Sequence, residues 1–297
     1  MPKTNAWIAA ARLRTLPLSV SGIMLGSSLG SEKPLWNSSI FWLAILTTIG
    51  FQILSNFAND YGDGIKGTDK DRAGEQRLVA SGIITPKQMK YAMILTAIST
   101  ILIAIILIFK AFGKDQFLLS LLFFVLGVVS IIAAIKYTVG ETAYGYSGFG
   151  DVFVFLFFGL LSVLGSYFLF TKNLNWELLL PATTIGLLSV GVLNLNNMRD
   201  RQSDSKHHKK TIVVALGASK AKIYHYGLLV FAMISALIFA VLNYTSPKQF
   251  IYFIAFIPLL LNIKTVYLNI ESKHLDSELK KVALSTFMYA LLFVFFH

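Results

Sequence analysis

Residues 39–72 join an apolar run to a polar loop and read S-I-F-W-L-A-I-L-T-T-I-G-F-Q-I-L-S-N-F-A-N-D-Y-G-D-G-I-K-G-T-D-K-D-R. The first part has about 20 mostly apolar residues, enough for a helix that crosses about 30 Å of membrane hydrocarbon. The second part is rich in asparagine, aspartate, glycine and lysine. This stretch therefore predicts a membrane helix that ends in a polar loop at one membrane face.

Eight further segments have a similar length and composition, so the same reasoning extends to the whole chain. The chain has 297 residues, of which 55% are hydrophobic and 14% are charged, and its mean hydropathy is +0.66. A typical soluble domain has about 25% charged residues. We therefore predict an all-α protein, a single integral-membrane domain over 1–297 with nine transmembrane helices. Their expected positions are about 16–31, 39–58, 88–109, 116–135, 152–171, 178–196, 224–242, 249–269 and 280–296.

The net charge of +11 predicts membrane orientation rather than a nucleic-acid partner, because no soluble basic domain fits between the apolar runs. The N-terminus and the even-numbered loops hold 20 of the 26 Lys and Arg residues. Basic residues favour the cytoplasmic side of a membrane. We therefore expect a multi-pass protein of the cell membrane, with its N-terminus and polar loops in the cytoplasm and its C-terminus outside. The absence of cysteine excludes thiolate chemistry and zinc–cysteine or iron–sulfur sites.

Two long polar loops, 59–87 and 197–223, resemble each other. Each follows a helix that ends in asparagines, continues into basic residues and closes with the pattern V-A-x-G, at 79–82 and 214–217. The two loops are separated by four helices. This spacing predicts an internal repeat of about 16–135 and 152–269.

Each loop carries oxygen ligands four residues apart, Asn59 with Asp63 and Asp200 with Asp204. If the preceding helix continues into the loop, these side chains lie on one face, one turn apart. Carboxylate and amide oxygens suit Mg²⁺, which completes its shell with water and substrate phosphates. Basic residues lie around both pairs. An oligophosphate with its metal ions would fit between the acidic and the basic side chains, since the metal ions bind the acids and the phosphates bind the basic groups. These candidate phosphate ligands are Lys66, Arg72, Arg77, Arg199, Lys206, Lys209 and Lys210.

Other interpretations of these loops stay open at this point. Each loop alone could be a solvated face with weak ion pairs. A secondary transporter with a repeat is a second possibility, although such proteins place ionisable residues near the bilayer centre, and the spans here are almost free of charge apart from Lys264. Asp60-Tyr-Gly-Asp63-Gly64 also begins like the D-x-x-D-G-x-x-A-R motif of CDP-alcohol phosphotransferases, but Gly67-Thr68 stand where Ala-Arg is required. We expect His207 and His208 to be exposed rather than ligating.

With its nine spans and paired motifs, the chain resembles the UbiA family of intramembrane aromatic prenyltransferases. The motifs are Asn59-Asp60-Tyr-Gly-Asp63 and Asp200-Arg-Gln-Ser-Asp204, and the resemblance extends from Arg12-Leu-Arg14-Thr15-Leu-Pro17 over nearly the whole chain. The strings A-N-D-Y-G-D-G-I-K-G-T-D, G-Y-S-G-F-G-D at 145–151 and N-N-M-R-D-R-Q-S-D are similar to the menaquinone branch of the family. Asp69 lies six residues after Asp63, which departs from the ubiquinone-branch spacing.

The resemblance implies Mg²⁺-dependent transfer of a polyprenyl group from polyprenyl diphosphate to an aromatic acceptor. The menaquinone branch implies 1,4-dihydroxy-2-naphthoate as the acceptor, with loss of CO₂ to give demethylmenaquinone and diphosphate, and 4-hydroxybenzoate is the alternative. The polyprenyl tail would reach membrane lipid between helices. Asn59, Asp63, Asp200 and Asp204 would hold the metal with support from Asp60 and Asp69, and Tyr137, Tyr146, Asn56 and Asn197 would contact the substrates.

Overall fold

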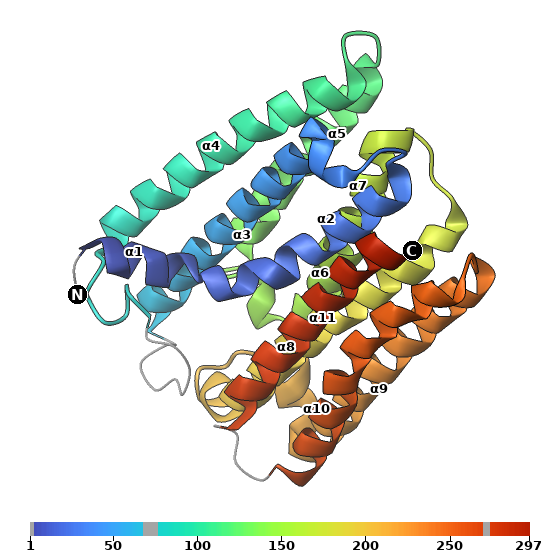
Figure 1. Cartoon of the computed structure of the whole chain (residues 1–297). Helices are drawn as coiled ribbons and strands as arrows, with labels where there is room; N and C mark the ends of the chain where they lie inside the picture. Colours follow the sequence, from blue (N-terminus) through green and yellow to red (C-terminus); the bar gives the residue numbers. More distant parts are fainter. Residues whose placement is uncertain (1–2, 68–76, 270–273) are drawn as a thin grey trace.

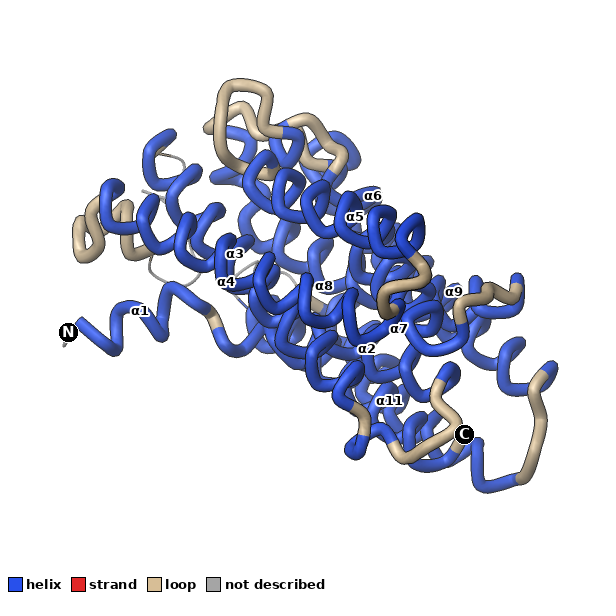
Figure 2. The backbone as a smooth tube through the Cα atoms, turned by 90° about the horizontal axis from the view of Figure 1, so that it is seen from above, coloured by secondary structure: helices blue, strands red, loops and turns tan. Residues whose placement is uncertain are grey.

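The structure is a computed structural model that describes residues 3–67, 77–269 and 274–297. The described residues contain nine helical segments that are long and apolar enough to cross a membrane, and no strand (Figure 2). The predicted all-α membrane bundle is therefore confirmed. The helices run side by side, and the two termini lie at opposite ends of the bundle (Figure 1).

The first half of the chain forms four spans, and the first of them, Thr4–Gly30, is divided into α1, η1 and α2. The elements are α1 (Lys3–Ala11), η1 (Leu13–Thr15), α2 (Leu16–Gly30), η2 (Leu35–Asn37), α3 (Ser39–Lys66), α4 (Pro86–Phe112) and α5 (Phe117–Lys136). Arg12 separates α1 from η1 with a left-handed backbone, φ 49°. The spans α4 and α5 are the least buried of the nine, so their apolar side chains face lipid.

The second half forms five spans around α8, which is the most buried of all. Its elements are η3 (Tyr144–Tyr146), α6 (Gly150–Val154), the π-helical segment η4 (Phe155–Leu161), α7 (Ser162–Thr171), η5 (Trp176–Leu178), α8 (Leu179–Lys206), α9 (Ile212–Leu242), η6 (Pro247–Phe256), α10 (Ile257–Leu268) and α11 (Leu275–Phe296). The largest apolar core lies between α8, α9, η6 and α11.

Small residues allow helices to approach closely, both within the second half and between the two halves. A methyl group added to Gly159 would lie 2.7 Å from the Ala182 carbonyl oxygen and 2.7 Å from the Gly186 Cα, so η4 and α8 meet backbone to backbone. Gly22 and Gly26 of α2 pack in the same way against Ser162 and Ser166. Membrane helices use small residues in this way because no hydrophobic force drives helix against helix in lipid.

Three helices, α3, α8 and α9, extend further than the sequence predicted. Helices α3 and α8 continue to Lys66 and Lys206, well beyond their apolar parts. Helix α9 begins at Ile212, twelve residues before the predicted start, and is broken at Gly217, whose φ of 75° is left-handed. The helix extensions place both acidic motifs on ordered helix rather than on loops. The internal repeat stays a prediction.

Candidate active site

The first motif lies in the last turns of α3. Helix α3 ends at Lys66 because Gly67 adopts φ 72°, and the Gly67 amide donates to the Asp63 carbonyl oxygen. Asn59 and Asp63 are therefore one helical turn apart, as their spacing predicted. Asp63 is 3% exposed and Asn59 is half-buried.

Asp60 points elsewhere and holds the segment that follows the first loop. Its two carboxylate oxygens accept hydrogen bonds from the backbone amides of Leu78 and Val79, each at 3.1 Å, and the residue is 1% exposed. This anchor places the neighbouring Arg77, which is buried, with Nη2 3.7 Å from Asp63 Oδ2. Asp60 thus positions a cation beside the first motif.

The second motif lies in the last turns of α8, where Asp200 is paired with its own neighbour. Arg199 Nε and Nη2 donate to Asp200 Oδ1 and Oδ2, both at 2.9 Å. Arg199 Nη2 also donates to Asn196 Oδ1 at 2.8 Å. Lys209 Nζ lies 3.8 Å from Asp204 Oδ1. Asp200 and Asp204 therefore each have a basic residue at hand.

Tyr146 connects the two motifs. Its hydroxyl donates to Asp63 Oδ1 at 2.7 Å, and its ring lies under two ammonium groups, Lys66 Nζ at 4.0 Å and Lys209 Nζ at 5.3 Å from the ring centroid. The Tyr146 carbonyl oxygen also accepts a hydrogen bond from the Lys210 amide at 3.0 Å. Side chains from the end of α3 and from the segment just after α8 therefore meet on one tyrosine at the same end of the bundle.

The turn after α5 closes the space between the motifs from the side. Thr138 Oγ1 donates to the Ala58 carbonyl oxygen at 2.9 Å and lies 3.3 Å from Asn59 Oδ1. Burial raises the pKa of the Tyr137 phenol, and the negative charges of Asp151, Asp63 and Asp204 raise it further. Tyr137 therefore lies near acidic groups of both motifs and stays neutral. Asp151 in turn accepts a hydrogen bond from the Tyr224 hydroxyl at 2.9 Å.

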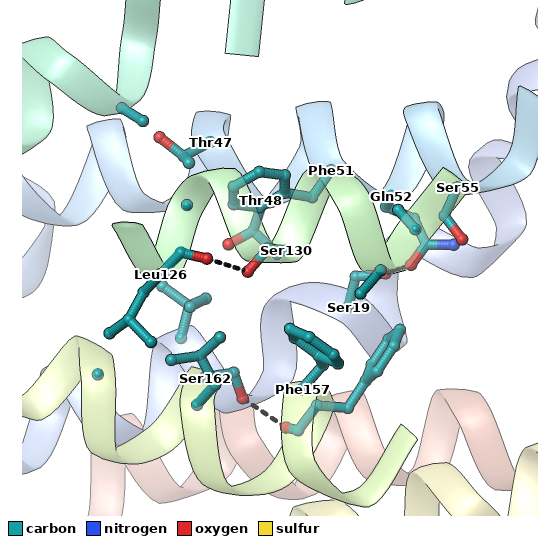
Figure 3. Close-up of a pocket in the computed structure, with 18 of the residues that line it drawn as sticks. Ser19, Thr47, Thr48, Phe51, Gln52, Ser55, Leu126, Ser130, Phe157 and Ser162 are labelled. Atoms are coloured by element: carbon teal, nitrogen blue, oxygen red, sulfur yellow. Dashed lines mark hydrogen bonds between the residues drawn. The ribbon is translucent and has the colours of Figure 1, made fainter. Parts of the chain in front are cut away.

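A chamber of about 350 Å³ extends from this polar end into the bundle (Figure 3). Asn59 and Tyr137 line the polar end, and Leu107, Phe123 and Leu169 line the part deep in the membrane region. Its wall is mostly apolar and includes the π-helical segment η4. A short polar strip interrupts this wall, in which Ser19 donates to Gln52 at 2.7 Å and Gln52 donates to Asn56 at 3.2 Å.

The structure brings together most of the predicted residues that it describes. Asn56 and Tyr137 line the chamber, whereas Tyr146 lies at its polar end without being part of the lining. Asn197 is buried within α8, while Lys206 and Lys210 are exposed. His208 is exposed as expected, and His207 is half-buried with Nδ1 2.9 Å from the Ser203 carbonyl oxygen. Asp69 and Arg72 lie outside the described residues.

Sequence reasoning missed several residues at this end of the molecule. Tyr144 lines the chamber and stacks on Phe153, with ring centroids 3.9 Å apart. Asp276, at the start of α11, receives a hydrogen bond from Arg199 Nη1 at 2.6 Å. The tyrosine-rich segment around 144 was a detectable signal. Nothing in the local sequence connects Asp276 with a residue 77 positions earlier.

The donor set at the two helix ends fits a divalent cation shared with a ligand. Among the described residues no three Asp, Glu or His side chains form a ready cation cage. The motif side chains are carboxylates and an amide, the hard oxygen ligands that Mg²⁺ takes, and Mg²⁺ usually binds through one or two carboxylates plus substrate phosphates. The basic side chains beside the motifs could bind the phosphate oxygens of such a substrate.

The model of the UbiA prenyltransferase family matches residues 16–292. The chain is 39% identical to the 1,4-dihydroxy-2-naphthoate octaprenyltransferase of Haemophilus influenzae, over 98% of this chain and 95% of that protein. It is 38% identical to the enzyme of the same name from Escherichia coli, over 98% of this chain and 94% of that protein.

Solved structures share the fold. A UbiA homolog from Archaeoglobus fulgidus bound to GPP and Mg²⁺ superimposes with a TM-score of 0.66 at 14% identity, covering 97% of this chain and 99% of that one. The apo structure of a UbiA homolog from Aeropyrum pernix K1 gives a TM-score of 0.69 at 12% identity, covering 95% and 96%. The family match and the curated relatives, rather than this shared fold, favour an intramembrane enzyme over a transporter.

Proposed function

Because the chain belongs to the UbiA prenyltransferase family, we propose that it transfers a polyprenyl group from polyprenyl diphosphate to 1,4-dihydroxy-2-naphthoate. The acceptor is taken from the relatives that match over nearly their whole length. The observation that carries the proposal is that Tyr146, at the polar end of an apolar chamber, contacts both Asp63 of the first motif and Lys209, which lies beside Asp204 of the second.

In this proposal the diphosphate lies between the ends of α3 and α8. Asn59, Asp63, Asp200 and Asp204 would hold Mg²⁺, with Asp69 in support. When bound, the ion supplies charge neutralisation to the phosphate oxygens. A UbiA homolog from Archaeoglobus fulgidus was solved with GPP and Mg²⁺ bound, which supports a prenyl diphosphate and Mg²⁺ as the molecules that bind here. The structure adds a role for Asp60, which holds the turn that presents Arg77.

The basic residues act on the leaving group. Lys66 and Lys209, which share the Tyr146 ring, and Arg77 beside Asp63 lie where they can contact phosphate oxygens. As the bond between the allylic carbon and the phosphate oxygen breaks, negative charge grows on the diphosphate, and these cations stabilise it. Arg72, Arg199, Lys206 and Lys210 complete the proposed anion-binding set.

The chamber wall acts on the prenyl group. Tyr137 and Tyr144 present aromatic rings to the chamber, and such rings stabilise the positive charge that develops on the allylic carbon. The apolar lining keeps out water, which would otherwise capture that carbon. The acceptor ring then bonds to the allylic carbon at the position of its carboxylate, which leaves as CO₂, and diphosphate is released.

The decisive assay supplies the purified protein with Mg²⁺, a polyprenyl diphosphate and one of two acceptors. We expect prenylated product and release of CO₂ with 1,4-dihydroxy-2-naphthoate, and no product with 4-hydroxybenzoate. Prenylation of 4-hydroxybenzoate alone would place the chain in another branch of the family. Failure of both acceptors, with no diphosphate released, would refute the proposal.

Orientation is part of the proposal as well. The chain is a multi-pass membrane protein, and its N-terminus and even-numbered loops hold 20 of the 26 Lys and Arg residues. The distribution of Lys and Arg supports placing the end of the bundle that holds both motifs, and the N-terminus, in the cytoplasm. The C-terminus would then lie outside.

A further inference from the structure

Asp276 belongs to neither motif but reaches one of them. It lies in the first turn of α11, and Arg199 Nη1 of α8 donates to its Oδ1 at 2.6 Å. Its other oxygen, Oδ2, lies 3.6 Å from Arg14 Nη1 in η1 and 3.9 Å from Lys280 Nζ. One carboxylate therefore connects the first, sixth and ninth spans at the end of the bundle that holds the site.

The same guanidinium that contacts Asp276 also fixes Asp200. Its Nε and Nη2 form two parallel hydrogen bonds to the two oxygens of Asp200, and its Nη2 donates to Asn196 as well. A guanidinium is planar, and its donors are held in a rigid fork. The orientation of the Asp200 carboxylate therefore depends on the orientation of the Arg199 guanidinium. Asp276 in turn fixes that guanidinium by accepting a hydrogen bond from Nη1.

Burial makes this pair more than a surface ion pair. The Arg199 side chain is 2% exposed and that of Asp200 is 3% exposed, whereas that of Asp276 is 34% exposed. Exposed ion pairs contribute little to stability, but removing one partner of a buried charge has a large effect. Arg199 carries one positive charge and faces two carboxylates, so the pair Asp200 and Asp276 leaves a net negative charge beside the second motif.

We propose that Asp276 is a positioning residue of the second motif, which orients the Asp200 carboxylate through Arg199 toward the cation that accompanies the diphosphate. This inference rests on the proposed function, because it presumes a diphosphate and a divalent cation at the helix ends. It changes the role of Arg199 from a phosphate ligand to the link between two carboxylates. Partners of this kind around a ligating carboxylate typically affect metal affinity by about 10–100-fold.

The test uses the full-length protein and Asp276→Ala, with Lys280→Gln as the matched control. Lys280 lies one turn from Asp276 on the same helix, its side chain is 55% exposed, and it contacts the same carboxylate. The first readout is thermal unfolding in inorganic pyrophosphate as MgCl₂ is raised, which needs no turnover. The second is the Mg²⁺ concentration that gives half-maximal prenyl transfer.

We expect Asp276→Ala to raise the Mg²⁺ concentration at half-response by about 10-fold or more in both readouts. Lys280→Gln should match the unmodified protein. Asp276→Asn keeps an oxygen that can accept from Arg199, so it should give a smaller shift in the same direction. Combining Asp276→Ala with Arg199→Lys should add little to the Arg199→Lys shift, because both changes break one network.

The inference is overturned if Asp276→Ala lowers the unfolding temperature but leaves the Mg²⁺ response unchanged, which is the result of a purely structural role. It is also overturned if Lys280→Gln shifts the response equally, or if Mg²⁺ with pyrophosphate does not stabilise the unmodified protein. If Asp276→Ala does not fold, the Mg²⁺ response of Asp276→Asn is compared with that of Lys280→Gln, and the same outcomes decide. Stabilisation by Mg²⁺ and pyrophosphate without prenyl transfer would refute the proposed function while leaving the role of Asp276 testable by unfolding.

Discussion

At the scale of residues, the site depends on side chains that connect the acidic motifs to their surroundings. Tyr146 contacts Asp63 of the first motif and Lys209, which lies beside Asp204 of the second. Asp60 holds the backbone that carries Arg77. The acidic motifs predict which side chains lie near a cation. Contacts such as these determine the distances between those side chains.

The carboxylates of the two motifs should both be required for turnover. We expect Asp63→Ala and Asp204→Ala each to lower prenyl transfer by about 10²-fold or more, the scale of losing one strong electrostatic group. Product formation per folded protein measures this. Asp115→Ala, an exposed carboxylate at the opposite end of the bundle, is the control and should keep full activity. Near-normal rates in Asp63→Ala or Asp204→Ala would remove that residue from the mechanism.

Tyr146→Phe should separate the hydroxyl from the ring. The change removes the hydrogen bond to Asp63 but keeps the aromatic face under Lys66 and Lys209. A hydrogen bond to a charged group contributes about 1.5–3 kcal/mol, so kcat/KM should fall by about 10–100-fold. Tyr146→Ala should lower it further. Equal rates for Tyr146→Phe and the unmodified protein would show that the hydroxyl has no role.

Asp60→Asn should lower stability first and activity second. The amide would turn an N–H group toward one of the two backbone amides that Asp60 now accepts from, leaving a buried donor unsatisfied. We expect a loss of about 1–3 kcal/mol in the free energy of unfolding, measured in denaturant. Asp115→Asn is the matched control. A variant as stable as the unmodified protein would contradict the anchoring role.

At the scale of elements, the sequence predicted every span but not the full length of the helices. Hydropathy marks only the part of a helix that lies in lipid, so it could not show that α3 and α8 continue to Lys66 and Lys206. The i, i+4 spacing of the motifs would place their side chains on one face only if the helices continued, and the structure shows that they do. The left-handed break at Gly217 and the π-helical segment η4 could not be predicted, because they depend on packing rather than on local composition.

Gly159→Ala should force η4 away from α8. The new methyl group would lie 2.7 Å from backbone atoms of α8, which cannot move aside as a side chain can. Overpacking of this kind typically costs about 1–3 kcal/mol. Thermal unfolding in detergent measures the loss. Gly227→Ala, whose methyl group would meet nothing within 4 Å, is the control and should be at least as stable as the unmodified protein.

At the scale of the whole molecule, the lengths of the apolar runs predicted the nine-span bundle, and the resemblance carried by the paired motifs indicated the family. The described helices confirm the first, and the family match confirms the second. Contacts between distant segments were beyond this reasoning. Asp276 meets Arg199 only because α11 packs beside α8, and a single sequence carries no record of that packing.

The orientation can be tested directly because the chain contains no cysteine. Single cysteines at Gln202 and at Lys114 lie at exposed positions at opposite ends of the bundle. With the active site in the cytoplasm, Gln202→Cys should resist an impermeant thiol reagent added to intact cells, and Lys114→Cys should react. The opposite pattern would invert the proposed topology.

The break at Arg12 leaves α2 with only fifteen residues, Leu16–Gly30. At 1.5 Å per residue, α2 alone measures about 22 Å, which is less than the hydrocarbon thickness of an ordinary bilayer. The first span therefore crosses the hydrocarbon only together with the segment before the break, over Thr4–Gly30. Reconstitution in bilayers of graded acyl length should then change activity little, because the two parts of this span together are long enough for thin and ordinary bilayers alike.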